Sequence, residues 1–166
     1  AAWRLACGAA SEPTCDGASR LACAVAWRPA CDEASELAFD AAARDRLERV
    51  RPVLAALRQD WASLRGLAEQ RDHFAEEAGR SASPELEETI GRIEGEMERI
   101  QKRVQARAAE MAKLGALLKS DPEEGLLDFY SERNGEIVFL CWKWGEESLA
   151  HWHTIEGGFA ARQPLP

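Results

Sequence analysis

Residues 84–119, PELEETIGRIEGEMERIQKRVQARAAEMAKLGALLK, decide the architecture of this chain. Apolar side chains recur there in steps of three and four, which is the seam of a heptad repeat, while charged residues fill the other faces. Ser83 is a suitable N-cap, and Pro84 stands at the first helical position, where a missing amide costs nothing. The pattern therefore predicts one long amphipathic helix. Its seam consists of Leu86, Ile90, Ile93, Met97, Ile100, Val104, Met111, Leu114 and Leu118.

One polar residue, Arg107, interrupts this seam. Two interpretations are open: the guanidinium fixes the register of the helix pair, or, as is more usual, it extends outward to solvent.

A second stripe of the same kind precedes the first. Its members are Leu47, Val50, Leu54, Leu57, Trp61 and Leu64. We expect Asp40 to be the N-cap of this helix, Pro52 to kink or restart it, and its end to lie near Gly79. Residues 80–83 are then a short polar connection, and a short connection makes the two helices antiparallel neighbours. The prediction is a two-helix coiled-coil hairpin over residues 40–119.

Two helices alone rarely bury two such stripes completely. We therefore expect the hairpin to pack against the remainder of the chain at one end. We also expect it to pack against a second copy of itself, which predicts a homodimer with a four-helix arrangement.

Asn134-Gly135 is the strongest short signal for a β-hairpin, because a type I′ turn needs positive φ at both positions. It predicts strands at 126–132 and 136–144, with Asp128 opposite Cys141 and Phe129 opposite Leu140. A third strand is expected at about 149–154, in a register that its longer turn leaves open. The fold class is therefore α+β, with a small three-stranded antiparallel β module at 121–166.

The face of the β module that carries Leu127, Phe129 and Trp142 is the expected core, and the opposite face is mixed. Asp128, Cys141 and His151 could lie side by side on that mixed face. A carboxylate, a thiol and an imidazole in one row are typical of nucleophilic or metal chemistry. The alternative is a buried cysteine beside a hydrogen-bonded histidine, which is the commoner arrangement.

Residues 3–42 repeat with a period of eight, and Cys7, Cys15, Cys23 and Cys31 fall at one position of the repeat. The period matches neither a helix nor a strand, and the close cysteine pairs of a zinc site are missing. We interpret residues 1–38 as a poorly ordered low-complexity leader; a four-cysteine metal site and a short helical extension are the alternatives. Residues 39–166 are expected to form a single domain.

Composition narrows the classes of function. The 166 residues include 30% charged side chains and carry a formal net charge of −8, which argues against a nucleic-acid binder. The sequence has no apolar run that could span a bilayer and no signal peptide, so we expect a cytoplasmic protein without membrane attachment.

Residues 121–165 resemble an uncharacterised bacterial family, domain of unknown function 2203. Their sequence is DPEEGLLDFYSERNGEIVFLCWKWGEESLAHWHTIEGGFAARQPL. The family pattern matches at Gly125–Phe129, Leu140–Lys143, Trp152-His153 and Gly158–Pro164, and the resemblance extends over about residues 39–165. It implies no activity or cofactor. It shifts the candidate ligand or metal site to Asp128, His153, Glu156 and Arg162, with Cys141, Lys143 and His151 as weaker candidates, since His151 stands where an aromatic residue is expected.

Two hypotheses of function follow, and the sequence leaves open whether the protein is an enzyme. The first is a non-enzymatic interaction or scaffold protein that acts through the coiled-coil hairpin, with a protein partner. The alternative is a metal- or small-ligand-binding protein, with a hydrolase as one form of it, whose site lies around His153. Elemental analysis of untagged protein and of His153→Ala separates them.

Overall fold

The computed structural model describes residues 33–81 and 83–165, so most of the octad repeat lies outside the described residues. Two antiparallel helices, α3 (Glu33–Arg80) and α4 (Pro84–Lys113), are followed by five strands. These are β1 (Ala116–Leu118), β2 (Leu126–Arg133), β3 (Glu136–Lys143), β4 (His151–Thr154) and β5 (Gln163–Pro164), with a short 3-10 helix, η1 (Phe159–Ala161), before the last. The strands form one antiparallel sheet in the order β1-β2-β3-β4-β5. The α+β class is confirmed, whereas the expected count of three strands is wrong.

Helix α3 begins at Glu33, so the prediction of Asp40 as its N-cap is wrong. Asp40 is buried in the second turn, where Oδ2 accepts a hydrogen bond of 2.5 Å from Arg133 Nη2. Glu36 accepts from Nη1 of the same guanidinium at 3.1 Å. The carboxylate is needed as a counter-charge, because Arg133 enters the interface between the β2–β3 turn and the helix.

The helix also continues without a restart through Pro52. The ring lies on the exposed side of α3, so the hydrogen bond that it removes faces water.

Helix α4 starts at Pro84 as predicted but ends at Lys113, not at residue 119. Gly115 adopts φ +78°, the left-handed conformation that terminates a helix, and its amide donates to the carbonyl of Ala112 at 3.0 Å. Leu118, assigned from the sequence to the helical seam, instead belongs to β1 and pairs with Leu127. The sequence Ala-Leu-Leu at 116–118 is compatible with a helix or a strand. The positive φ of Gly115 ends the helix, so these residues form β1.

The β2–β3 hairpin is confirmed in detail. Asn134 and Gly135 have φ of 52° and 80°, as a type I′ turn requires, and Asp128 pairs with Cys141 and Phe129 with Leu140. Strand β4 takes the register in which His151 is opposite Cys141. The strands missing from the prediction are β1, assigned to the helix, and β5, two residues long in an irregular tail.

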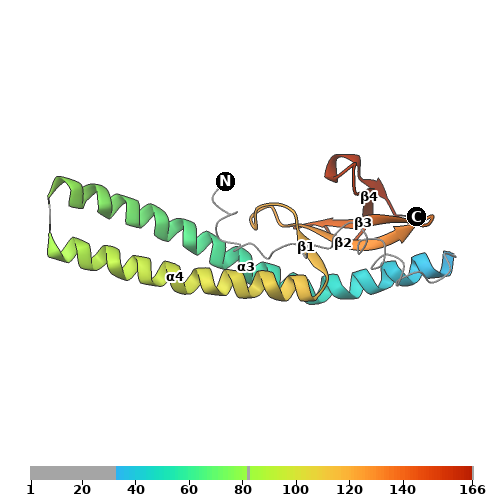
Figure 1. The fold of residues 1–166 in the computed structure, drawn as a ribbon, viewed down its shortest axis with the longest axis horizontal. Helices are drawn as coiled ribbons and strands as arrows, with labels where there is room; N and C mark the ends of the chain where they lie inside the picture. The colour runs from blue at the N-terminus through green and yellow to red at the C-terminus, as the bar shows by residue number, and fades with distance from the viewer. Residues whose placement is uncertain (1–32, 82, 166) are drawn as a thin grey trace, which may run out of the picture.

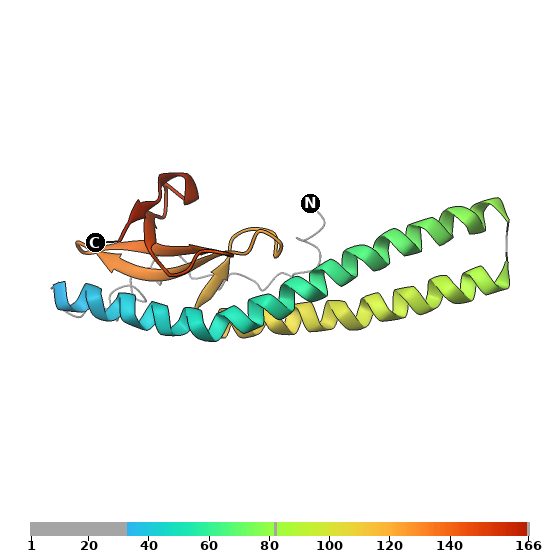
Figure 2. The ribbon, with the colours of Figure 1, turned by 180° about the vertical axis from the view of Figure 1, so that it is seen from behind.

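The core lies between α3 and one face of the sheet, with Trp142, Phe129 and Leu127 packed against Leu47, Val50 and Leu54. Figure 1 shows the sheet over the N-terminal half of α3, while the far part of the helix pair extends beyond it. The view from behind, in Figure 2, shows the same arrangement. We call residues 62–81 and 83–101 the helical arm.

Where the arm joins the body, the two helices are tied by charge. Asp60 of α3 is 7% exposed, and it receives Arg103 at 3.0 Å on Oδ1 and Arg107 at 2.9 Å on Oδ2. The polar interruption of the α4 seam is therefore half of a cross-helix ion pair, which favours the register interpretation of Arg107.

Candidate functional site

Three donor side chains meet on the face of the sheet that points away from the helices. Asp128 comes from β2, Cys141 from β3 and His153 from β4, and each is at most 3% exposed. One donor atom from each lies within 4.8 Å of the other two. The closest pair is His153 Nε2 and Asp128 Oδ1, at 3.3 Å. We call these three residues the outer-face cluster.

The tautomer of His153 follows from its second hydrogen bond. Nδ1 lies 2.8 Å from the carbonyl oxygen of Thr154, which can only accept, so Nδ1 carries a proton. In the neutral ring Nε2 therefore carries no proton, and its lone pair points at the Asp128 carboxylate. Two acceptors facing each other in a buried place need a proton or a cation between them.

Cys141 is chemically quiet in this setting. Burial, with the neighbouring Asp128 carboxylate, raises the pKa of the Cys141 thiol to about 12, against a smaller opposite effect of Arg162. The thiol is protonated at neutral pH, so the row of Asp128, Cys141 and His151 considered from the sequence is not an activated nucleophile.

The other candidates border the cluster or lie apart from it. Arg162 lies close enough to Cys141 to act on the pKa of its thiol, donates to Glu146 Oε1 at 2.7 Å and has its guanidinium carbon 3.9 Å from the centre of the Phe159 ring. Lys143 pairs with Glu124 at 2.9 Å. Glu156 is exposed in the turn after β4 and is not part of the cluster.

His151 faces Cys141 in the backbone register, as the expected row required. The ring that reaches Asp128, however, belongs to His153, diagonally across the sheet. The structure thus groups Cys141, a weaker candidate from the sequence, with Asp128 and His153, and it places Glu146, which was not a candidate, against Arg162. The alternation of strand residues was the available signal for Cys141, whereas nothing in the sequence indicates the contact of Glu146 with Arg162.

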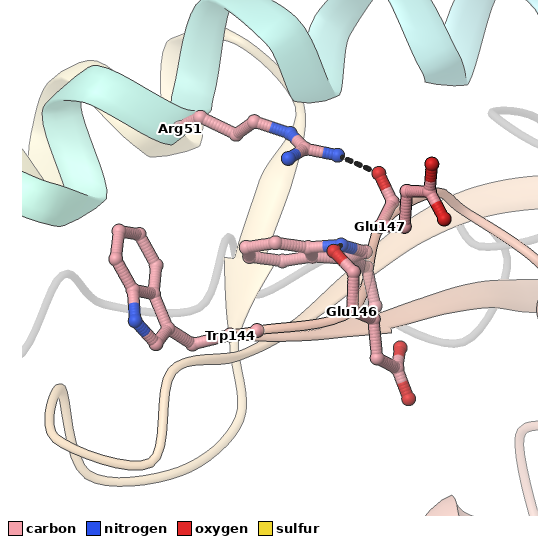
Figure 3. Close-up of a pocket in the computed structure, with 6 residues that line it drawn as sticks. Arg51, Trp144, Glu146 and Glu147 are labelled. Atoms are coloured by element: carbon pink, nitrogen blue, oxygen red, sulfur yellow. Dashed lines mark hydrogen bonds between the residues drawn. The ribbon is translucent and has the colours of Figure 1, made fainter.

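A pocket of about 330 Å³ opens on the helix side, beside the β3–β4 turn. Figure 3 shows Arg51 reaching across it to the backbone oxygen of Glu147, at 2.5 Å. The Arg51 guanidinium also lies 5.1 Å from the centre of the Trp142 ring, whose Nε1 donates to the Glu146 carbonyl at 2.9 Å. These contacts hold the β3–β4 turn against α3. The residues around the pocket therefore have a structural role.

A second pocket, of about 400 Å³, lies at the base of the helical arm. We call it the arm-base groove. Four of its lining residues are apolar, three are charged and one is an amide. They are Trp61, Leu64, Arg65, Ala68, Met97, Gln101, Asp121 and Glu123.

The fold and the outer-face cluster define an elongated α+β protein, in which a helix pair carries a five-stranded sheet. The chain belongs to the family of uncharacterized conserved proteins DUF2203, whose family model matches residues 39–165. No curated protein and no solved structure matches it. Within the described residues, neither helix contains a stretch long and apolar enough to cross a membrane.

Proposed function

We propose that the protein is a non-enzymatic interaction protein that associates through its helical arm, first of all with a second copy of itself. The observation that carries this proposal is the incomplete burial of the seam beyond the sheet. Leu67, Phe74, Leu86 and Ile90 stay half-buried, whereas Leu47, Val50 and Leu54 beneath the sheet are fully covered. A further pair of helices against the arm would remove this apolar surface from water.

The arm-base groove is a suitable point of contact. Half-buried Trp61 and Met97 lie among its lining residues, and such a lining accepts an apolar side chain from outside.

Charge sets the conditions under which copies would associate. Residues 62–101 include ten acidic and five basic side chains, so two arms repel each other at low ionic strength. Added salt screens this repulsion and should strengthen self-association, whereas it should weaken the binding of a basic partner. Sedimentation velocity across a salt series therefore distinguishes the two kinds of association. A monomer at micromolar concentration at every salt level contradicts the dimer.

A matched pair of variants locates the interface. Ala68→Arg fills the arm-base groove, whereas Ala41→Arg makes the same change at an exposed position of α3 beneath the sheet. The first should abolish association and the second should leave it unchanged. Equal behaviour of the two variants removes the groove from the proposal.

A second candidate function is the binding of a metal or small ligand on the β module. The buried contact between Asp128 and His153 favours it, since a carboxylate and an imidazole lone pair face each other there. A His153→Gln variant that binds the same metal as the parent protein would count against this candidate.

A further inference from the structure

We propose that Asp128, Cys141 and His153 form a binding site for one zinc ion, or a divalent ion of similar softness, that links strands β2, β3 and β4. The donor set of one carboxylate oxygen, one sulfur and one imidazole nitrogen is typical of zinc. The inference rests on the second candidate function, which it makes specific, and it is independent of association through the arm. It also differs from the site expected from the sequence, because Cys141 takes the place of Glu156.

The geometry fits a tetrahedral ion. With bonds of about 2.0–2.3 Å, neighbouring donor atoms of such a site lie about 3.3–3.8 Å apart. The Nε2–Oδ1 distance is 3.3 Å, and all three donor atoms are within 4.8 Å of one another. Small side-chain rotations therefore bring the sulfur to its position, leaving a fourth position for water or another donor.

The orientation of His153 is that of a ligand. Its Nδ1–H is held by the Thr154 carbonyl at 2.8 Å, which directs the Nε2 lone pair at the cluster. A second hydrogen bond of this kind fixes the tautomer of metal-binding histidines and increases their basicity.

Charge balance supports a divalent cation. A carboxylate and a thiolate together carry two negative charges, which one divalent ion offsets without leaving a buried net charge. The nearest guanidinium, Arg162, is already paired with Glu146 at 2.7 Å, and its N–H can still donate to a metal-bound sulfur.

The experiment must exclude the four cysteines of the N-terminal repeat. The parent protein for the test therefore carries Cys7→Ser, Cys15→Ser, Cys23→Ser and Cys31→Ser in the full chain, which leaves Cys141 as its remaining thiol. This parent should bind one zinc per chain and gain thermal stability on loading, because the ion binds the folded state. Absence of stoichiometric binding overturns the site.

Cobalt identifies the ligands in this same parent protein, before any ligand is changed. Bound Co²⁺ should show a thiolate charge-transfer band together with the visible bands of a tetrahedral ion. A cobalt adduct without the thiolate band shows that Cys141 is not a ligand and overturns the assignment. This readout does not depend on whether a ligand variant folds.

Single variants then test each ligand. Cys141→Ala, Asp128→Asn and His153→Gln should each weaken zinc binding by more than about 100-fold, since changes to residues that only hydrogen-bond to a metal ligand already cost about 10–100-fold. Glu156→Gln is the matched control and should bind as the parent does. Loss of binding in Glu156→Gln with retention in Cys141→Ala returns the site to the one expected from the sequence.

Discussion

At the scale of single residues, a buried charge at the interface of the two helices has defined partners. Asp60 illustrates this, because its two oxygens are shared between Arg103 and Arg107 of the opposite helix. Both arginines reach water, with side-chain exposures of 48% and 31%, so the aspartate is the member of the group that depends on the pairing.

Asp60→Ala should therefore destabilise the protein by about 1–3 kcal/mol, since it removes charge-assisted hydrogen bonds at the helix interface. The free energy of unfolding from chemical denaturation measures the effect. Asp72→Asn is the control, because Asp72 is exposed and bonds to its neighbour Arg71; it should change stability by less than about 0.5 kcal/mol. Equal losses would show that the cross-helix pair contributes nothing particular.

Cys141 should be unreactive in the native, metal-free protein. With its pKa raised to about 12 and no exposed surface, the thiol offers almost no thiolate at pH 8. In the variant lacking the four N-terminal cysteines, a disulfide reagent should modify Cys141 on the timescale of unfolding and at once in denaturant. Rapid native labelling would contradict this environment.

At the scale of elements, Gly125 fixes how the chain enters β2, and the carboxylate of Glu36 holds the β2–β3 turn on α3. Gly125 precedes β2 with φ +65°, and a Cβ there would lie 2.8 Å from Cβ of Trp144. Both the conformation and the space exclude a side chain.

Gly125→Ala should accordingly cost about 1–3 kcal/mol of stability. Gly66→Ala is the matched control, because Gly66 is helical and nothing lies within 4 Å of an added Cβ. That control should be stabilising by up to about 1 kcal/mol. Thermal unfolding of both variants reports the opposite signs, and a harmless Gly125→Ala would contradict the close approach to Trp144.

The attachment of the β2–β3 turn to α3 should depend on pH. The hydrogen bond from the Asn134 amide, with the contact to Arg133, lowers the pKa of Glu36 from its usual 4.5. A lowered pKa means that the stabilisation is complete above the unfolded pKa and is lost as pH falls through the folded one. Glu36→Gln should therefore flatten the stability profile below about pH 4.5 and leave its shape above that range unchanged.

At the scale of the whole molecule, the sequence predicted the architecture wherever a pattern was local. The helix period, the Asn-Gly turn and the alternation of strand residues specified the start of α4, the β2–β3 hairpin and its register, whereas the end of α4 at Lys113 was predicted too late. The start of α3 was wrong because Asp40, which resembles a cap, serves a buried arginine 93 positions away. The outer-face cluster was only partly predictable. The alternation of strand residues predicts that Asp128 and Cys141 share a face, whereas the contact of His153 with Asp128 across the sheet depends on side-chain rotamers.

The helical arm has a consequence for how this molecule could change during evolution. Each arm helix rises about 1.5 Å per residue and contacts mainly its partner helix, so its length is not coupled to the sheet. Removing seven residues from each helix beside the turn, such as 74–80 and 84–90, would shorten the arm by about 10 Å while keeping the same faces together. Removing only five from each would rotate the faces apart. The length of the arm could therefore change in steps of seven residues while the β module and its buried cluster stay intact.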